Sequence, residues 1–472
     1  MKNPLPDSRA IRKAFDEAAE NRDRWRRRNR TYHEEVQRFC RCAIPEGASV
    51  LIIGCGTGDL LAGLKPGRGL GIDFSETMIK RARKKYPDLE FRVGHAENLP
   101  EGERFEWIIL SDLLGFLPDI QRVFSELWKV VLPGSRVLIT HYNPLWKPLL
   151  KTAEIFRLKM PEPVQNWLTH RDIQNLLYLS GFEEIRRESR LLLPRRVPLL
   201  AWLANRVLAR VPGLRRLCLI QTLVARPVFP AREASSVSCS VIIPCKNERG
   251  TVETAIARTP VMGAHTELIF VVGNSTDGTV EEVERCMNLY RGTDIRLIQQ
   301  TGVGKGDAVR QGFDVARGDI LMILDGDLTV APEDLPKFFD ALISGRAELA
   351  VGSRLVYPME QQAMRFLNLL GNRFFGWVLS CLLGQRILDT LCGTKVLFAS
   401  DYKKMARARR DVCDFDPFGD FDLLLGASKL VRKIVEVPVR YRDRVYGSTQ
   451  IHRFRHGFLL LRVCWTAFRK LH

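Results

Sequence analysis

The chain has 472 residues, with 72 Lys and Arg against 54 Asp and Glu and a formal net charge of +18. That length suggests about two to three domains, and a hydrophobic content of 46% excludes a disordered, collagen-like or coiled-coil chain. The charge excess predicts attraction to an anion, which leaves nucleic acid, a phosphate-bearing substrate and an acidic membrane surface as partners.

The cysteines and the apolar stretches of the sequence indicate the cellular compartment in which the protein is expected. The eleven cysteines are scattered, without the CxxC pairs that bind zinc. The N-terminus, MKNPLPDSRAIRKAFDEAAE, lacks an apolar signal core, and no stretch reaches the roughly 18 uncharged apolar residues of a spanning helix. We therefore expect a cytoplasmic protein with reduced thiols, able to sit on the cytoplasmic face of a membrane.

The first part of the chain changes character at Val50. Residues 1–48 are expected to form a basic helical segment, and an α/β domain is predicted at 49–190. Strands are predicted within 50–58, 69–75, 105–112 and 135–140, with helices at 75–86 and 119–131. Apolar runs that alternate with helical stretches are typical of a parallel α/β sheet.

A glycine-rich turn follows the first predicted strand, at Gly54, Gly56 and Gly58. Without a Cβ, such a turn lets a ligand approach the backbone closely. Asp73 ends the next strand, where a carboxylate can accept hydrogen bonds from both hydroxyls of a ribose. Turn and acid together predict a nucleoside-containing cofactor, and the alternative is that the glycines serve only a tight turn.

The runs VLIIGCGTGDLL, GIDFSETMIKRAR, GHAENLP and LLGFLPDIQRVFSELWKVVLPGSRVLIT carry a family resemblance. They resemble a class I S-adenosylmethionine (SAM)-dependent methyltransferase, a Rossmann-like fold, over roughly residues 45–190. The resemblance implies that the glycine turn faces the amino-acid part of SAM and that Asp73 holds its ribose. It also implies that Ala96 and Glu97, beside His95, flank the adenine.

Two departures from the family pattern bear on methyl transfer. The family often has acids where this chain has Ile52 and His95. A neutral histidine can still hydrogen-bond to adenine, but isoleucine cannot replace a carboxylate. An active methyltransferase and an inactive methyltransferase-like domain therefore both stay open. Asp112, at another strand end, is either a site residue near the methyl acceptor or a structural cap.

Basic residues are concentrated in two stretches. Between Glu188 and Glu233 there are nine arginines and no acid, among apolar patches and prolines, and we treat 191–236 as an Arg-rich amphipathic connector. Six further Lys and Arg follow Asp443, again without an acid. Together these stretches hold fifteen positive charges, most of the chain's excess.

A second α/β domain, with motifs different from those of the first, is predicted at 237–450. Strands are expected within 239–244, 267–273, 295–300, 319–327 and 348–353, and a helix at 304–317. In LMILDGDLTVAPEDL, Asp325 and Asp327 end a hydrophobic strand with one residue between them. Two carboxylates at that spacing can share a hard divalent cation, magnesium or manganese, whose other ligands are phosphate oxygens and water. Such a cation would neutralise a diphosphate leaving group.

The motifs SVIIPCKNE, VVGNSTDGT, GVGKGDAVRQGF, VGSRLV, DTLCGTK, FGDFDLLL and IVEVPVRYRDRVYGST surround that acidic pair. They resemble family-2 glycosyltransferases of the GT-A fold, closest to the dolichol-phosphate mannose and glucose synthases, from about Cys239 to Ser448. The resemblance implies a nucleotide-sugar donor and a lipid-phosphate or glycan acceptor.

The resemblance also implies residue roles. The donor nucleotide would lie against Pro244, Glu248, Ser275, Asp277 and Lys305, and the metal on Asp325 and Asp327. Arg354 would meet the acceptor phosphate, Asp420 and Asp422 would lie beside the acceptor, and Arg444 would contact phosphate as its loop closes.

The second domain also departs from the family pattern, at positions that bear on which nucleotide base the donor carries more than on the transfer reaction. Val272 and Gly273 stand where the base loop usually carries acids, so uracil and guanine donors both stay open. Thr329 replaces a glutamine near the metal, and Gln450 replaces a frequent lysine. The expected reaction is a single inverting displacement. A phosphate acceptor needs no strong base, whereas a hydroxyl acceptor would use Asp420 or Asp422, which otherwise read as helix N-terminal acids.

Two further stretches are apolar and basic. Residues 364–384 and the C-terminal segment 451–472 are too short or too charged to span a bilayer. Each fits an amphipathic helix that lies on an anionic membrane surface, and each also fits an ordinary core helix. We expect peripheral membrane binding.

Three function classes follow. The leading hypothesis is a bifunctional enzyme, a sugar transferase with a methyltransferase domain. The second is a monofunctional glycosyltransferase whose methyltransferase-like domain only binds a ligand. The third, an RNA methyltransferase, rests on charge alone, and the basic stretches lack the aromatic interleaving of a stacking platform, so no nucleic-acid partner is expected.

Overall fold

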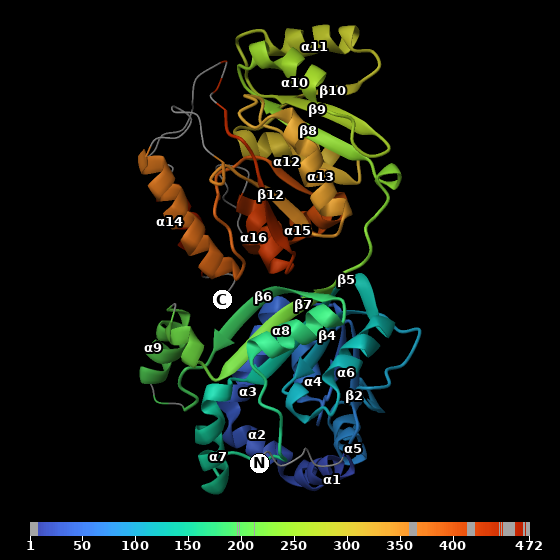
Figure 1. Ribbon diagram of the computed structural model, residues 1–472, viewed down its shortest axis with the longest axis vertical. Helices are drawn as coiled ribbons and strands as arrows, with labels where there is room; N and C mark the ends of the chain where they lie inside the picture. The colour runs from blue at the N-terminus through green and yellow to red at the C-terminus, as the bar shows by residue number, and fades with distance from the viewer. Residues whose placement is uncertain are drawn as a thin grey trace. The chain divides into compact units, whose positions relative to one another are not determined.

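The computed structural model describes residues 8–195, 197, 199–211, 213–357, 366–412, 421–442, 444, 446, 458–465 and 468. The chain forms two units, which divide after Val228. Each contains a seven-stranded sheet with helices packed against it (Figure 1). The two α/β domains that the sequence predicts are therefore confirmed.

The first sheet has the strand order β3-β2-β1-β4-β5-β7-β6. Its strands are β1 (Ser49–Ile53), β2 (Arg68–Asp73), β3 (Glu90–Val93), β4 (Phe105–Ser111), β5 (Val131–Tyr142), β6 (Phe182–Arg190) and β7 (Ile220–Pro227). The pairs from β3 to β5 are parallel, and β7 runs antiparallel to both β5 and β6. The parallel sheet expected from the sequence is thus a mixed one.

Strand β7 comes from the stretch that the sequence analysis treats as a connector. It has a neighbour on each side, with Val224 opposite Leu138 of β5 and opposite Arg186 of β6. The backbone therefore returns into the first unit before it passes to the second.

Helices of the first unit lie on both sides of the sheet. They are α1 (Ser8–Ala18), α2 (Arg22–Arg28), α3 (Arg30–Ala43), α4 (Asp59–Leu64), α5 (Glu76–Lys85), α6 (Ile120–Glu126), α7 (Lys147–Ile155), α8 (His170–Leu179) and α9 (Leu200–Arg206). Helix α5 shows why such segments begin where they do. Ser75 caps it by accepting a hydrogen bond from the Met78 amide at 3.1 Å, and basic residues occupy its last turn.

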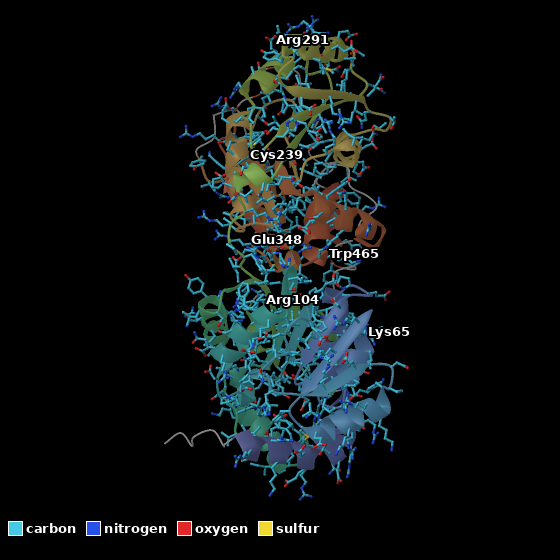
Figure 2. All side chains as sticks on the ribbon, turned by 90° about the vertical axis from the view of Figure 1, so that its right-hand side faces the viewer. Lys65, Arg104, Cys239, Arg291, Glu348 and Trp465 are labelled. Atoms are coloured by element: carbon cyan, nitrogen blue, oxygen red, sulfur yellow. The ribbon has the colours of Figure 1, made fainter. Side chains whose placement is uncertain are left out.

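The second sheet has the order β10-β9-β8-β11-β13-β12-β14. Its strands are β8 (Cys239–Cys245), β9 (Thr266–Val272), β10 (Asp294–Gln299), β11 (Ile320–Ile323), β12 (Leu349–Ser353), β13 (Lys395–Phe398) and β14 (Ile434–Pro438). Only β13 runs antiparallel to its neighbours. Cys239, labelled in Figure 2, begins β8 and is fully buried, as are most side chains of the central strands. Burial on both faces is typical of strands covered by helices on either side.

The helices that cover this sheet are α10 (Val252–Arg258), α11 (Thr279–Leu289), α12 (Lys305–Val315), α13 (Leu335–Ile343), α14 (Phe366–Leu383), α15 (Ala399–Val412) and α16 (Phe421–Lys429). Two separate apolar clusters form the core. Helices α10, α11 and α13 contribute to the first, and α12, α14 and α16 to the second.

Two absences hold for the described part of the chain. No helix there has the length and apolar content to cross a bilayer. The cysteines in those ranges are all free thiols, mostly buried.

Candidate active sites

The glycine turn after β1 has a backbone that favours glycine at every predicted position. Gly54, Gly56 and Gly58 have φ values of 75°, 54° and 82°. A Cβ on Gly58 would lie 2.7 Å from the Phe91 ring, so this glycine allows close packing beneath the turn.

Asp73, at the end of β2, holds that turn in place. Its Oδ2 accepts a hydrogen bond from the Gly56 amide at 2.8 Å, and its Oδ1 accepts one from Ser75 at 2.9 Å. Burial raises the pKa of Asp73 above its usual value. A carboxylate has about four acceptor positions, so further hydrogen bonds to a ligand are open to it.

A cavity of about 1140 Å³, called here the first cavity, lies against this turn. Five of the six residues predicted to bind SAM line this cavity: Gly54, Gly56, Asp73, Ala96 and Glu97. The sixth, Gly58, is not among its lining residues. Pockets for drug-sized ligands typically have about 300–1,000 Å³. The first cavity therefore has room for a nucleoside cofactor and part of a second molecule.

The N-terminal helices contribute to the wall of the first cavity, which the sequence did not predict. Arg22 and Arg26 of α2 and His33 of α3 all line it. Burial and the nearby Arg26 and Arg22 lower the pKa of His33 to about 3. A basic helical segment is expected to be exposed to solvent. Only the helical spacing of Tyr32, Val36 and Phe39, which are buried, could have indicated that this segment packs against the domain.

Asp112 lies in the same cavity, directly after β4. Its Oδ2 accepts a hydrogen bond from Tyr32 Oη at 2.7 Å, and its Oδ1 accepts one from Thr140 Oγ1 at 3.0 Å. Burial raises the pKa of Asp112, and its φ of 54° is unusual for a residue with a side chain. Asp112 therefore lines the first cavity and also joins α3 to β5, so the site role and the structural role predicted for it both stay open.

In the second unit, three turns meet at Asp325, just after β11. Lys305, the first residue of α12, places its Nζ 2.6 Å from Asp325 Oδ1. A Cβ on Gly393, in the turn before β13, would lie 2.0 Å from Asp325 Oδ2 and 2.3 Å from Lys305 Nζ. Burial raises the pKa of Asp325, but Lys305 outweighs this and the pKa lies below its usual value.

Asp327 is bonded to residues from its own turn and from far along the chain. Its Oδ1 accepts a hydrogen bond from Thr329 Oγ1 at 2.9 Å, and Arg444 Nη2 lies 2.7 Å from its Oδ2. Arg444 Nη1 is also 3.6 Å from Glu248 Oε1. The predicted metal pair, one nucleotide residue and the predicted phosphate-binding arginine therefore form one cluster.

Glu248 is a buried carboxylate in this cluster. Its Oε2 has no hydrogen-bond partner among the described residues. Burial raises the pKa of Glu248 to about 7, with Arg444 opposing and the neighbouring aspartates adding to the rise. A buried acceptor without a donor is costly, so this atom suits a ligand hydroxyl or amide.

Ser275 and Asp277, after β9, tie the two nucleotide loops together. Ser275 Oγ accepts a hydrogen bond from the Asn247 amide at 3.0 Å, and Asp277 Oδ2 accepts one from Arg249 at 3.1 Å. Pro244, near the end of β8, packs closely on the acidic turn, because a Cβ on Gly326 would lie 2.9 Å from its carbonyl oxygen. These residues gather at the carboxyl ends of parallel strands, where α/β sheets bind their ligands.

Two family models match the chain. The model described as glycosyl transferase family 2 matches residues 240–407, and one described as a methyltransferase domain matches residues 50–134. The chain joins a methyltransferase domain to a family 2 glycosyltransferase domain.

Known relatives match one domain each. A dolichol-phosphate mannosyltransferase of Pyrococcus furiosus is 35% identical over 47% of this chain and 63% of its own length. A demethylmenaquinone methyltransferase of Lactiplantibacillus plantarum is 29% identical over 31% of this chain and 68% of its own length. The chain spans less than two thirds of the mannosyltransferases it matches, 63% of the archaeal protein and 42% of a yeast protein of the same name.

Solved structures also resemble single domains. A SAM-dependent methyltransferase of Thermotoga maritima has a TM-score of 0.38 and 18% identity, covering 46% of this chain and 99% of that one.

Arg354 of the glycosyltransferase domain is held away from solvent. Its Nε lies 2.7 Å from Asp389 Oδ2 and its Nη2 2.8 Å from Asp389 Oδ1, and Asn372 donates to the same Oδ1. Burial lowers the pKa of Arg354, but Asp389 outweighs this and the pKa lies above its usual value. The structure thus commits much of this guanidinium to an internal ion pair, and its predicted contact with the acceptor phosphate stays a prediction.

The predicted acidic pair near the acceptor is seen only in part. Asp422, in the first turn of α16, has its Oδ2 3.8 Å from Arg310 Nη1. Asp420 lies outside the described residues.

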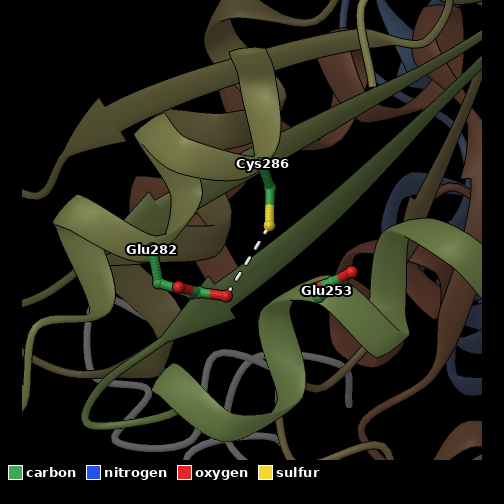
Figure 3. A group of neighbouring side chains, drawn as sticks. All are labelled: Glu253, Glu282 and Cys286. Carbon is green, nitrogen blue, oxygen red and sulfur yellow. Dashed lines mark hydrogen bonds between the residues drawn. The ribbon is translucent and has the colours of Figure 1, made fainter. Parts of the chain in front are cut away.

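Another acidic group of the glycosyltransferase domain is less suited to a hard divalent cation, because one of its three members is a thiol. Helix α10 carries Glu253, and α11 carries Glu282 and Cys286, and one ligand atom of each lies within 4.8 Å of the others. Figure 3 shows the hydrogen bond that joins Cys286 to Glu282. Arg285 Nη2, however, hydrogen-bonds to both glutamates and offsets one of their two negative charges. The all-oxygen pair Asp325 and Asp327 suits a hard divalent cation better.

Proposed function

We propose that the chain is a bifunctional transferase. Its glycosyltransferase domain transfers a sugar from a nucleotide-sugar donor to a polyprenyl-phosphate acceptor, and its methyltransferase domain uses SAM. The observation that carries the first activity is the cluster of Asp325, Asp327, Lys305 and Arg444 at the strand ends.

The chain's own residues suggest how the donor is held. Asp325 and Asp327 would bind magnesium or manganese, which neutralises the departing diphosphate when bound. Lys305, at a helix N-terminus beside Asp325, is placed to contact a phosphate. The unpartnered Oε2 of Glu248 is suited to a ribose or base donor group.

The acceptor is proposed from chemistry and from the relatives. A phosphate acceptor is already ionised, so an inverting displacement needs no strong base, and the relatives named above are dolichol-phosphate mannosyltransferases. A hydroxyl acceptor would instead require Asp420 or Asp422 as the base.

An acceptor of this kind resides in a membrane, and we propose that the glycosyltransferase domain binds an anionic membrane peripherally. Phe374 and Trp377 of α14 are more than half exposed next to the exposed Arg373. Trp465, labelled in Figure 2, is 62% exposed on the last described helix. Exposed aromatics beside arginine are suited to the interfacial region of a bilayer.

A screen of nucleotide sugars for metal-dependent hydrolysis or transfer tests the glycosyltransferase assignment. Asp325→Asn/Asp327→Asn should lower turnover at least 100-fold, and Asp340→Asn, at an exposed carboxylate of α13, should not. Full metal-dependent turnover in the double variant would refute the site.

For the methyltransferase domain the support is the first cavity with Asp73 at its glycine turn. Isothermal titration with SAM distinguishes an active cofactor site from a fold that has lost it. Absence of SAM binding would favour the monofunctional alternative.

A further inference from the structure

The methyltransferase domain exposes a group of apolar side chains on two segments, α7 with its flanks (144–158) and the described residues of 195–217, which are 195, 197, 199–211 and 213–217. We call this group the basic apolar face. Large exposed members include Leu149, Ile155 and Phe156 in the first segment and Leu199, Trp202 and Leu217 in the second. Leu199 is 84% exposed and Trp202 is 62% exposed. Soluble proteins rarely expose so many large apolar side chains together unless they bind something.

Hydrogen bonds join the two segments. Trp146 Nε1 donates to the Leu217 carbonyl at 2.7 Å, and Asn143 Nδ2 donates to the Arg216 carbonyl at 2.8 Å. Figure 1 shows α7 and α9 on the same side of this unit. The exposed side chains of the two segments therefore belong to one surface.

The charges on this face identify the occupant. Arg195, Arg215 and Arg216 are exposed in the second segment, where the sequence has no acid between Glu188 and Glu233. Lys147 and Arg157 are exposed in the first segment. Its one acid, Glu154, is bonded to Lys151 and Lys159. Apolar side chains ringed by cations complement an anionic lipid surface, in which the aromatics enter the interface and the arginines meet the headgroups.

The first cavity opens on this face. Leu149 and Leu158 of the first segment and Arg195 of the second are exposed, and all three also line the cavity. The glycine turn and Asp73 line the same cavity. One end of the first cavity therefore lies at the predicted SAM site and the other lies at the basic apolar face.

We propose that the methyltransferase domain docks through the basic apolar face on an anionic bilayer and takes its methyl acceptor from that bilayer. The acceptor is thus a lipid-borne molecule that enters between 144–158 and 195–217. The acceptor class rests on the proposed SAM-dependent function, whereas the docking surface does not.

Flotation of the full chain with phosphatidylcholine vesicles containing phosphatidylglycerol tests the docking surface. Every chain in this comparison carries Phe374→Ser/Trp377→Ser/Trp465→Ser, because the glycosyltransferase domain is proposed to bind the same vesicles. On that background, Leu199→Glu/Trp202→Glu should lower the vesicle-bound fraction at least fivefold. The matched control, Tyr178→Glu/Leu179→Glu, makes the same charge change at exposed apolar residues of α8 and should bind like the background chain. Equal binding by both double variants would overturn the proposal.

Hydrogen–deuterium exchange of the unaltered chain provides a test that needs no variant. Vesicles should protect 147–155 and 200–217 from exchange. Protection elsewhere only would overturn the proposal. Protection of these segments without vesicles, increasing with protein concentration, would assign the face to a second copy of the chain instead.

Transfer of labelled methyl from SAM tests the acceptor class. With vesicles of total lipid from the source organism, label should appear in the organic phase on extraction, and label only in water-soluble product would overturn a lipid-borne acceptor. SAM binding is measured separately by isothermal titration. A chain that docks through this face without binding SAM would lose the proposed methyl transfer and keep the docking surface.

Discussion

Arg354 and Asp389 form a buried, two-pronged ion pair in the glycosyltransferase domain, with nitrogen–oxygen distances of 2.7 and 2.8 Å. Removing one partner of such a pair leaves a buried charge uncompensated and typically costs about 3–5 kcal/mol. Asp389→Asn should therefore lower the free energy of unfolding of this domain by about that amount. Calorimetry of the full chain should show the unfolding transition of the glycosyltransferase domain at a lower temperature than in the unaltered chain. The transition of the methyltransferase domain should keep its temperature. An unchanged profile, like that expected for Asp340→Asn, would contradict the structural role.

Gly393 leaves space for the contact between Lys305 and Asp325, since a Cβ there would lie 2.0 Å from the carboxylate. Gly393→Ala should displace that pair and lower sugar-transfer turnover at least tenfold, with the circular dichroism spectrum retained. Gly292→Ala is the control, because nothing lies within 4 Å of its Cβ position. Equal turnover in the two variants would show that the acidic turn tolerates the shift.

Asp73 anchors the glycine turn through the Gly56 amide. Asp73→Ala removes that anchor and the carboxylate that is proposed to accept hydrogen bonds from the ribose of SAM. We expect the affinity for SAM to fall at least tenfold by isothermal titration. Asp88→Asn, at an exposed carboxylate of the same domain, should bind SAM normally. If both variants bind equally, the cofactor lies elsewhere.

Glu248 makes stability depend on pH. Its pKa is raised from 4.5 to about 7 in the folded chain, so the folded state binds more protons than the unfolded state between these values. This contribution is fully present below about pH 4.5 and is lost as the pH rises through about 7. The melting temperature of the glycosyltransferase domain should fall more steeply over this range in the unaltered chain than in Glu248→Gln. Parallel curves would contradict the raised pKa.

Nine strands were predicted from apolar runs, β1, β2, β4, β5 and β8–β12, whereas β3, β6, β7, β13 and β14 were not. β6 reads FEEIRRESR, which lacks the apolar run of a buried strand. Its charges are matched in three dimensions, where Glu188 bridges Arg186 and Arg190, and Glu183 lies opposite Arg226 of β7. Hydrophobic periodicity cannot reveal a strand whose buried charges pair with one another and with a neighbouring strand.

The same limit applies to the sites. Asp325 and Asp327 were predicted from their spacing at the end of an apolar strand, where ligands of α/β sheets bind, and Lys305 was predicted from the resemblance to family-2 glycosyltransferases. The contact between Arg444 and Asp327, and the arginines of α2 beside the glycine turn, depend on how separate segments pack, which no local pattern encodes.

The position of β7 between β5 and β6 has a consequence for synthesis. A ribosome makes β5 and β6 well before the strand that pairs with both of them. Until residue 227 has emerged, one edge of each lacks its hydrogen-bonding partner, and unpaired edges are prone to wrong pairing. The sheet of the methyltransferase domain therefore stays incomplete until the chain has been made to within 12 residues of β8, the first strand of the glycosyltransferase domain.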